Sequence, residues 1–203
     1  MERGQYPVAE ELQQFLEDSK ASLEKLLKLD QEVKRRDTAD LVIQTLTQIQ
    51  TAMKNVMEQN QKVQETSYWA LLNATVDIYH YCCLLRKSNY GKESSKFLAW
   101  SMMVMENNVV LCATKHLNWR VRLYSELAET YEELGAFKAA SKVVAHGLKQ
   151  VQELKEVEEC EPPLPEVTLY TLQSATNQLK ALDMKYGLLQ GTLMPDQWKK
   201  RLE

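Results

Sequence analysis

The stretch from Asn118 to Gln152 reads NWRVRLYSELAETYEELGAFKAASKVVAHGLKQVQ and decides the fold of this chain. Its apolar residues recur at steps of three and four, which is the spacing of one helix face. They form two stripes, namely Tyr124, Leu127, Ala128, Tyr131 and Leu134, and then Ala140, Val143, Val144, Gly147, Leu148 and Val151. Gly135 lies between the stripes, and glycine readily takes the left-handed backbone that ends a helix. The stretch therefore predicts two helices that are joined by a tight turn at Gly135.

These two predicted helices resemble a tetratricopeptide repeat. The residues that match the signature spacings of that repeat are Leu127, Ala128, Tyr131, Gly135, Phe137, Ala140, Gly147 and Leu148. Tyr124 stands where the repeat usually has tryptophan, and Gln152 stands where proline often closes the unit. Small residues at 128, 140 and 147 would let the two helix backbones lie close together. An ordinary antiparallel helix pair follows the same packing rules, so both interpretations stay open.

Composition predicts an all-α protein without a basic or strongly apolar bias. Of the 203 residues, 44% are hydrophobic, which is enough for a core, and only 6 are Gly and 5 are Pro, so long helical runs are uninterrupted. The net charge of −3 supplies no basic field that would attract nucleic acid. No run approaches the roughly 20 apolar residues that span a bilayer, and the first residues lack the apolar core of a secretory signal. We therefore expect no nucleic-acid partner and no membrane partner.

Residues 1–65 predict an N-terminal helical hairpin. Its first helix, expected over 8–36, has heptad spacing at Leu12, Leu16, Ser19, Leu23, Leu26, Asp30 and Val33. A second helix is expected over 38–65, with Asp37 as its N-cap and the polar Asn60 in its apolar seam. Asn60 either sets the register or marks the end of the seam. The hairpin either caps the repeats or extends from them as an arm.

Residues 66–155 predict a short array of antiparallel helix pairs that is tetratricopeptide-like and right-handed. A third helix is expected over 67–87 and a fourth over 91–113. The segment 89–102 aligns with 135–148 at a shift of 46 residues, which makes the third and fourth helices an earlier, longer copy of the fifth and sixth. Because 46 exceeds the 34 residues of a standard tetratricopeptide repeat, a HEAT-like organisation stays open.

Residues 156–203 predict a linker, a last helix and a tail. The acidic run from Glu153 to Glu161 leads into Pro162-Pro163-Leu164-Pro165, which is typical of a semi-stiff solvated loop. An acidic docking segment is the alternative. A seventh helix is expected over 166–186, and we expect Gly187 to end it.

The motifs that mark catalytic and cofactor sites are missing. The chain has no Gly-rich phosphate loop, no G-x-S-x-G pattern and no H-E-x-x-H pattern. Cys112 and His116 are four residues apart and could share a helix face, but structural zinc needs four ligands. The four cysteines predict reduced thiols of a cytosolic-type compartment. We therefore predict a protein that is not an enzyme and that has no catalytic, metal-binding or cofactor-binding residues.

The remaining candidate site is a surface for a protein partner. On the 118–134 helix, the face away from the apolar stripe carries Arg122, Ser125, Glu129 and Glu132. In stacked helix pairs this face lines the concave side, where an extended peptide or a partner helix would bind. On the earlier copy the same face carries Val76, Tyr79, Cys83 and Arg86. Packing against the N-terminal hairpin is the alternative for that copy.

Two neighbouring residues are further candidates for partner binding. Trp119 and Arg120 lie at the start of the 118–134 helix. Tryptophan and arginine dominate the energies of protein interfaces, so we predict both as anchors. Trp100 is a third such residue, for which a place in the core is the expected alternative.

Three stretches are more specific than a generic helical repeat. They are Trp69-Ala70-Leu71-Leu72-Asn73, the run LAWSMMVME from Leu98 to Glu106, and the run LNWRVRLY from Leu117 to Tyr124. Together with the helix layout, they make residues 67–150 resemble the cilia- and flagella-associated protein 54 family. Members of that family are very large helical-repeat proteins of the motile axoneme.

The resemblance implies a scaffold in a projection of the central-pair microtubules, without catalytic residues. It implies a role in cilium assembly and motility, including sperm flagella, and a place in the cytoskeleton of the axoneme. The implied partners are other central-apparatus proteins, with microtubules or calmodulin-linked assemblies as further candidates. The alternative is a cytosolic helical-repeat adaptor or regulatory subunit without a link to cilia.

Overall fold

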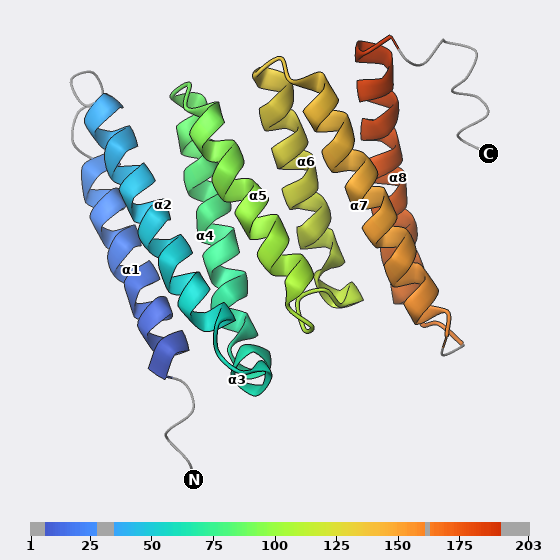
Figure 1. The fold of residues 1–203 in the computed structure, drawn as a ribbon, viewed down its shortest axis with the longest axis horizontal. Helices are drawn as coiled ribbons and strands as arrows, with labels where there is room; N and C mark the ends of the chain where they lie inside the picture. The colour runs from blue at the N-terminus through green and yellow to red at the C-terminus, as the bar shows by residue number, and fades with distance from the viewer. Residues whose placement is uncertain (1–6, 28–34, 161–162, 192–203) are drawn as a thin grey trace. The chain divides into compact units, whose positions relative to one another are not determined.

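The computed structural model describes residues 7–27, 35–160 and 163–191, and all regular structure in them is helical. The elements are α1 (Pro7–Leu27), α2 (Arg35–Met57), α3 (Gln61–Thr66), α4 (Tyr68–Lys87), α5 (Gly91–Asn107), the 3₁₀ helix η1 (Thr114–His116), α6 (Leu117–Glu133), α7 (Phe137–Glu158) and α8 (Glu166–Leu189) (Figure 1). The predicted all-α class is confirmed. The helices belong to two compact units, residues 1–111 and residues 112–203. The boundaries of these units differ from those of the three segments predicted from the sequence, which are 1–65, 66–155 and 156–203. The division into three segments stays a prediction.

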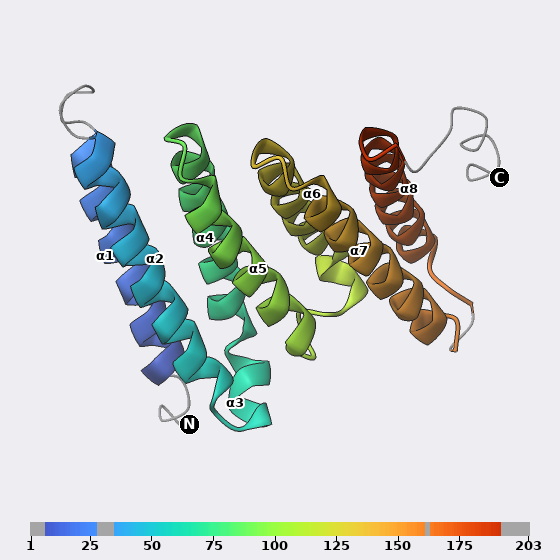
Figure 2. The same ribbon diagram turned by 45° about the horizontal axis from the view of Figure 1, so that its top comes forward.

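In the first unit the N-terminal hairpin packs on the helices that follow it. α1 and α2 lie side by side, and both contact α4 (Figures 1 and 2). The predicted seam of α2 is buried from Val42 to Val56. Lys20 of α1 also forms an ion pair of 2.8 Å with Asp77, a buried residue of α4. Apolar and ionic contacts therefore hold the hairpin against α4.

In the second unit α6, α7 and α8 contact one another, and Gly147 lies where they meet. A Cβ atom at position 147 would be 3.1 Å from the ring of Tyr124 in α6 and 3.2 Å from a methyl group of Leu179 in α8. Both neighbours are fully buried, so neither can move into solvent to make room. The predicted close approach of helices at this small residue is therefore present.

The turns from α4 to α5 and from α6 to α7 have the same backbone geometry, 46 residues apart. Each contains one left-handed residue, Asn89 with φ 65° and Gly135 with φ 71°. In each turn the next N–H donates to a carbonyl five residues earlier, at 2.9 Å from Tyr90 and at 2.8 Å from Ala136. This pattern satisfies carbonyls at the helix end and directs the chain back antiparallel. The turn predicted at Gly135 is thus confirmed, and its counterpart has asparagine.

Two asparagines end helices earlier than predicted. The expected 38–65 helix is divided, because the Asn60 side chain accepts a hydrogen bond of 3.1 Å from the Val63 N–H and caps the separate α3. Asn60 therefore marks the end of the seam. The expected 91–113 helix ends at Asn107, because the side chain of Asn108 accepts hydrogen bonds from two following backbone N–H groups.

Two other predicted helix boundaries are also wrong. α2 already begins at Arg35, so Asp37 lies inside it and is not its N-cap; arginine is a good helix former and continues the helix toward the N-terminus. Gly187 is buried inside α8, and the left-handed residue that follows this helix is Gly191, with φ 65°. The predicted seam positions Asp30 and Val33 lie outside the described residues.

We predict that Gly147→Leu destabilises the second unit. The new side chain would overlap Tyr124 and Leu179, and overpacking of a core usually costs 1–3 kcal/mol, so we expect about 2 kcal/mol. Urea unfolding followed by circular dichroism measures this loss. The matched control is Ala145→Leu, at an exposed position of the same helix, which should change stability by less than about 0.5 kcal/mol. Equal effects of the two substitutions would contradict the packing.

A second prediction concerns pH and the ion pair in the first unit. Burial raises the pKa of Asp77 above its ordinary 3.8, and this effect exceeds the opposing effect of Lys20. Because the folded-state pKa is raised, the stability that protonated Asp77 contributes is present below pH 3.8 and is lost as pH rises through the raised pKa. The free energy of unfolding of Asp77→Asn should therefore increase relative to that of the unsubstituted chain as pH rises from 3.8 to the raised pKa of Asp77. Above that pKa the difference between the two proteins should stay constant.

Thermal unfolding at a series of pH values measures the difference between the two proteins. Asp40→Asn is the control, because it makes the same chemical change at an exposed carboxylate on α2. If Asp77→Asn instead loses stability as pH rises, the attraction of Lys20 outweighs burial, and the account of this ion pair is wrong.

Candidate functional site

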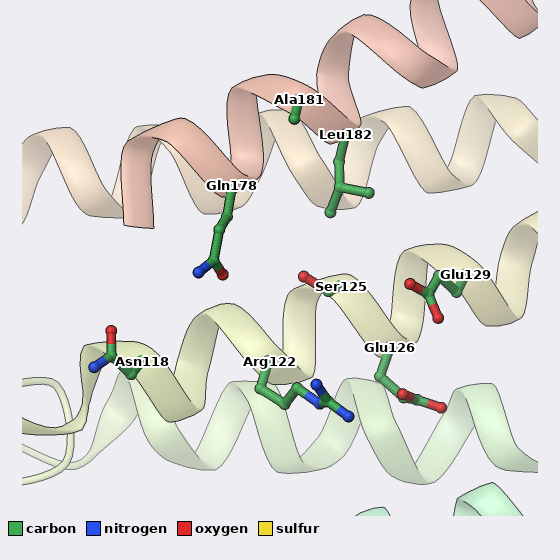
Figure 3. A pocket seen from close by; sticks show the side chains of 8 residues that line it. All are labelled: Asn118, Arg122, Ser125, Glu126, Glu129, Gln178, Ala181 and Leu182. Carbon is green, nitrogen blue, oxygen red and sulfur yellow. The ribbon is translucent and has the colours of Figure 1, made fainter. Parts of the chain in front are cut away.

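A groove of about 590 Å³ lies between α6 and α8 in the second unit (Figure 3). Its lining consists of Asn118, Arg122, Ser125, Glu126 and Glu129 from α6 and of Gln178, Ala181 and Leu182 from α8. Four of the α6 residues follow one another at steps of four, three and four, so they share one face of that helix. Arg122, Ser125 and Glu129 are among the six residues predicted to bind a partner, and the structure brings them together here.

The side chains divide the groove into a polar wall and a partly apolar wall. Gln178 and Leu182 extend from α8 toward α6, while Arg122 extends along α6 in the direction of Glu126 (Figure 3). The Ser125 hydroxyl donates to the Val121 carbonyl at 2.9 Å, which leaves a small side chain in the middle of the α6 wall. The α6 wall is therefore polar, and the α8 wall combines the amide of Gln178 with the aliphatic side chains of Ala181 and Leu182.

Glu132 lies beyond the groove and connects α6 to α8. Its carboxylate accepts a hydrogen bond of 2.6 Å from the Lys185 ammonium group and one of 3.0 Å from the Tyr186 hydroxyl. Tyr186 is fully buried and Glu132 is partly buried, so the hydrogen bond from Tyr186 is sheltered from water, while the contact with Lys185 is exposed. Of the predicted partner-binding residues, Glu132 is thus engaged within the unit. Its role toward a partner stays a prediction.

Trp119 and Arg120 do not line the groove. Trp119 is half-buried, and Arg120 is only 3% exposed. The Nε and Nη2 atoms of Arg120 form no hydrogen bond with the described part of the chain. Trp100 is half-buried as well, with the Lys54 ammonium group 5.2 Å from the centre of its ring. Partner binding by these side chains also stays a prediction.

On the earlier copy, the corresponding face is partly covered. Tyr79 is buried, and Val76, Cys83 and Arg86 are half-buried. α1 packs against α4, with an ion pair between Lys20 and Asp77 and a hydrogen bond of 3.1 Å between Asn73 and Gln13. These contacts favour the alternative in which this face of α4 packs against the hairpin.

The α8 wall of the groove was missed by the sequence analysis. Gln178, Ala181 and Leu182 lie at steps of three and four, which is a detectable helix face. Nothing in the sequence shows that this face lies beside α6, because α7, an acidic run and several prolines separate α6 from α8. The long connection hides a contact that a short turn would have indicated.

Within the described ranges there is no cluster of three or more His, Cys, Asp or Glu residues that could hold a metal ion. Cys82, Cys83, Cys112 and Cys160 form no disulfide bond in the described part of the chain. None of the described helices has the length and apolar character needed to cross a bilayer.

Comparison with known proteins gives consistent matches. Residues 18–190 match the family model described as cilia- and flagella-associated protein 54. The chain is 26% identical over 167 residues to cilia- and flagella-associated protein 54 of Chlamydomonas reinhardtii. That alignment covers 82% of this chain, and the chain spans only 5% of the length of the relative.

Solved structures with a similar fold are helical repeat proteins. A circular tandem repeat protein with novel repeat topology and enhanced subunit contact surfaces aligns with 90% of this chain and 42% of its own, with a TM-score of 0.51 and 13% identity. A de novo designed helical repeat protein aligns with 91% of this chain and 98% of its own, with a TM-score of 0.46 and 9% identity. At such low identity the first match supports the helical-repeat fold alone.

The fold is helical, and the matched family is associated with cilia and flagella. The family model extends over most of the sequence, including all of α2 to α8. The chain therefore belongs to the cilia- and flagella-associated protein 54 family.

Proposed function

We propose that this chain is a non-catalytic scaffold segment of the axoneme in motile cilia and flagella, within a projection of the central apparatus. The observation that carries the proposal is the family match over residues 18–190. A helical-repeat fold is well suited to such a role, because extended surfaces for other proteins are the usual function of these arrays. In this role the chain supports cilium assembly and motility, including that of sperm flagella.

The physical basis of the scaffold is a set of helices that hold a fixed surface. In the second unit, Gly147 lets three helices approach closely, and Glu132 adds hydrogen bonds from α6 to α8. Fixed helices keep side chains such as Arg122 and Glu129 at set positions on the groove wall. A preordered surface loses less conformational entropy when a partner binds.

Other proteins of the central apparatus are the partners that we propose. Microtubules and calmodulin-linked assemblies are further candidate partners of the chain. The alternative of a cytosolic adaptor unrelated to cilia has less support, since the family match connects the chain with cilia and flagella.

Proximity labelling tests this proposal. The chain, fused to a biotin ligase, is expressed in ciliated cells, and biotinylated proteins are identified from isolated axonemes and from the cell body. We expect central-apparatus proteins to be enriched over a control with the ligase alone. Labelling that is confined to the cell body, or that marks outer-doublet proteins instead, would contradict the proposed location.

A further inference from the structure

We infer that the first turn of α6 binds a small oxyanion of the phosphate class, and that the guanidinium group of Arg120 is its anchor. This anchor is not one of the residues that line the groove between α6 and α8. The inference goes beyond the proposed scaffold function and does not depend on it. It is carried by a buried charge without a described partner at the N-terminus of a helix.

Arg120 is enclosed by the protein, yet no described group compensates its charge. The residue is only 3% exposed, and its Nε and Nη2 atoms form no hydrogen bond with the described part of the chain. It also enters no ion pair there. Arginine keeps its proton in proteins, so it cannot avoid the cost of burial by becoming neutral. Because a buried charge without a counter-charge is strongly destabilising, we expect an anion beside it.

The two nitrogen atoms without a hydrogen bond lie on the same edge of the planar guanidinium group. The Nε and Nη2 atoms of Arg120 each carry an N–H on this edge. Such a pair of parallel donors matches two oxygen atoms of one carboxylate or phosphate group. A single carbonyl oxygen would not satisfy both donors in this geometry. The pair therefore indicates a ligand that offers two oxygen atoms at once.

The N-terminus of α6 adds a positive electrostatic potential at the same place. The positive end of the helix dipole lies there, and the N-cap residue His116 forms no capping hydrogen bond through its side chain. Arg120 belongs to the first turn of α6, and side chains of a helix extend back toward its N-terminus. The guanidinium group is therefore directed toward the end of the helix that favours phosphate groups.

The neighbouring charged residues favour a doubly charged anion. The pKa of His116 is lowered by the burial of its ring and then by the positive charges of Lys115 and Arg120, so the guanidinium group acts on this ring. An acidic residue near η1, Glu158, accepts a hydrogen bond from the Thr114 hydroxyl and none from Arg120. Two cations and one carboxylate leave a net positive charge at this turn, which phosphate would compensate better than a monoanion.

The test titrates the full chain, labelled with ¹⁵N, with inorganic phosphate at an ionic strength held constant with sodium chloride. NMR follows the ring of His116. A phosphate ion held by Arg120 favours the protonated imidazole, so we expect the pKa of His116 to rise. The thermal midpoint should rise by about 3 °C at a phosphate concentration about ten times the dissociation constant.

Two related anions test the chemistry of the site. Acetate offers two oxygen atoms but a single charge, so it should bind at least about fivefold more weakly than phosphate. Phenyl phosphate should also bind more weakly, because its ring does not fit the enclosed surroundings of Arg120. Equal binding of phosphate and phenyl phosphate would mean that a macromolecule can present the group, and it would contradict an enclosed site for a small ion.

Two variants locate the ion. Arg120→Met removes both donors and should abolish the change in the pKa of His116 and the rise in thermal midpoint. Arg120→Lys keeps the charge but loses the two-donor edge, so phosphate should bind at least about fivefold more weakly. The matched control is Arg122→Met, at an exposed position of the same helix, which should leave both responses unchanged. Circular dichroism verifies that each variant is folded.

Several results would overturn the inference. They are an unchanged pKa of His116 throughout the phosphate titration, equal affinity for phosphate and acetate, and equal responses of Arg120→Met and Arg122→Met. None of them affects ciliary proximity labelling, which tests the location of the chain. Conversely, a failure of that labelling leaves the phosphate titration intact, so the two proposals can fail separately.

Discussion

The contact of Gly147 with the ring of Tyr124 is the constraint on which the second unit depends. Tyr124 is a large, fully buried side chain, and the backbone of α7 can approach it because position 147 has no Cβ atom. Leu179 approaches the same point from α8. One missing methyl group therefore sets the spacing of three helices at once, and interiors packed at crystal-like density leave little room for adjustment.

That spacing has consequences at the surface. α8 is positioned by its apolar contacts at Leu179 and by the hydrogen bonds of Lys185 and Tyr186 with Glu132. The distance between α6 and α8 in turn determines the width of the groove lined by Ser125 and Ala181. Core and candidate site thus form one physical system, in which a buried glycine determines how the exposed side chains of the groove are spaced.

Much of the fold follows from short-range sequence signals. Helix periodicity and Gly135 predicted α6, α7 and their turn, and the shift of 46 residues has a structural counterpart in the left-handed residues Asn89 and Gly135. Helix ends were predicted less well, because Asn60 and Asn108 cap through side-chain hydrogen bonds that periodicity does not detect. Gly187 was predicted to end a helix but lies inside α8. The residue type alone does not distinguish a glycine within a helix from one that ends it.

For the candidate site, the sequence predicted the α6 wall but not the α8 wall, because the contact between α6 and α8 is long-range in the sequence.

Native-state hydrogen exchange of the second unit tests most directly whether α6, α7 and α8 form one cooperative body. The account predicts that the slowest amides around Tyr124, Gly147 and Leu179 share one opening free energy, equal to that of global unfolding. Exchange of the α8 amides through a separate opening of much lower free energy would contradict it.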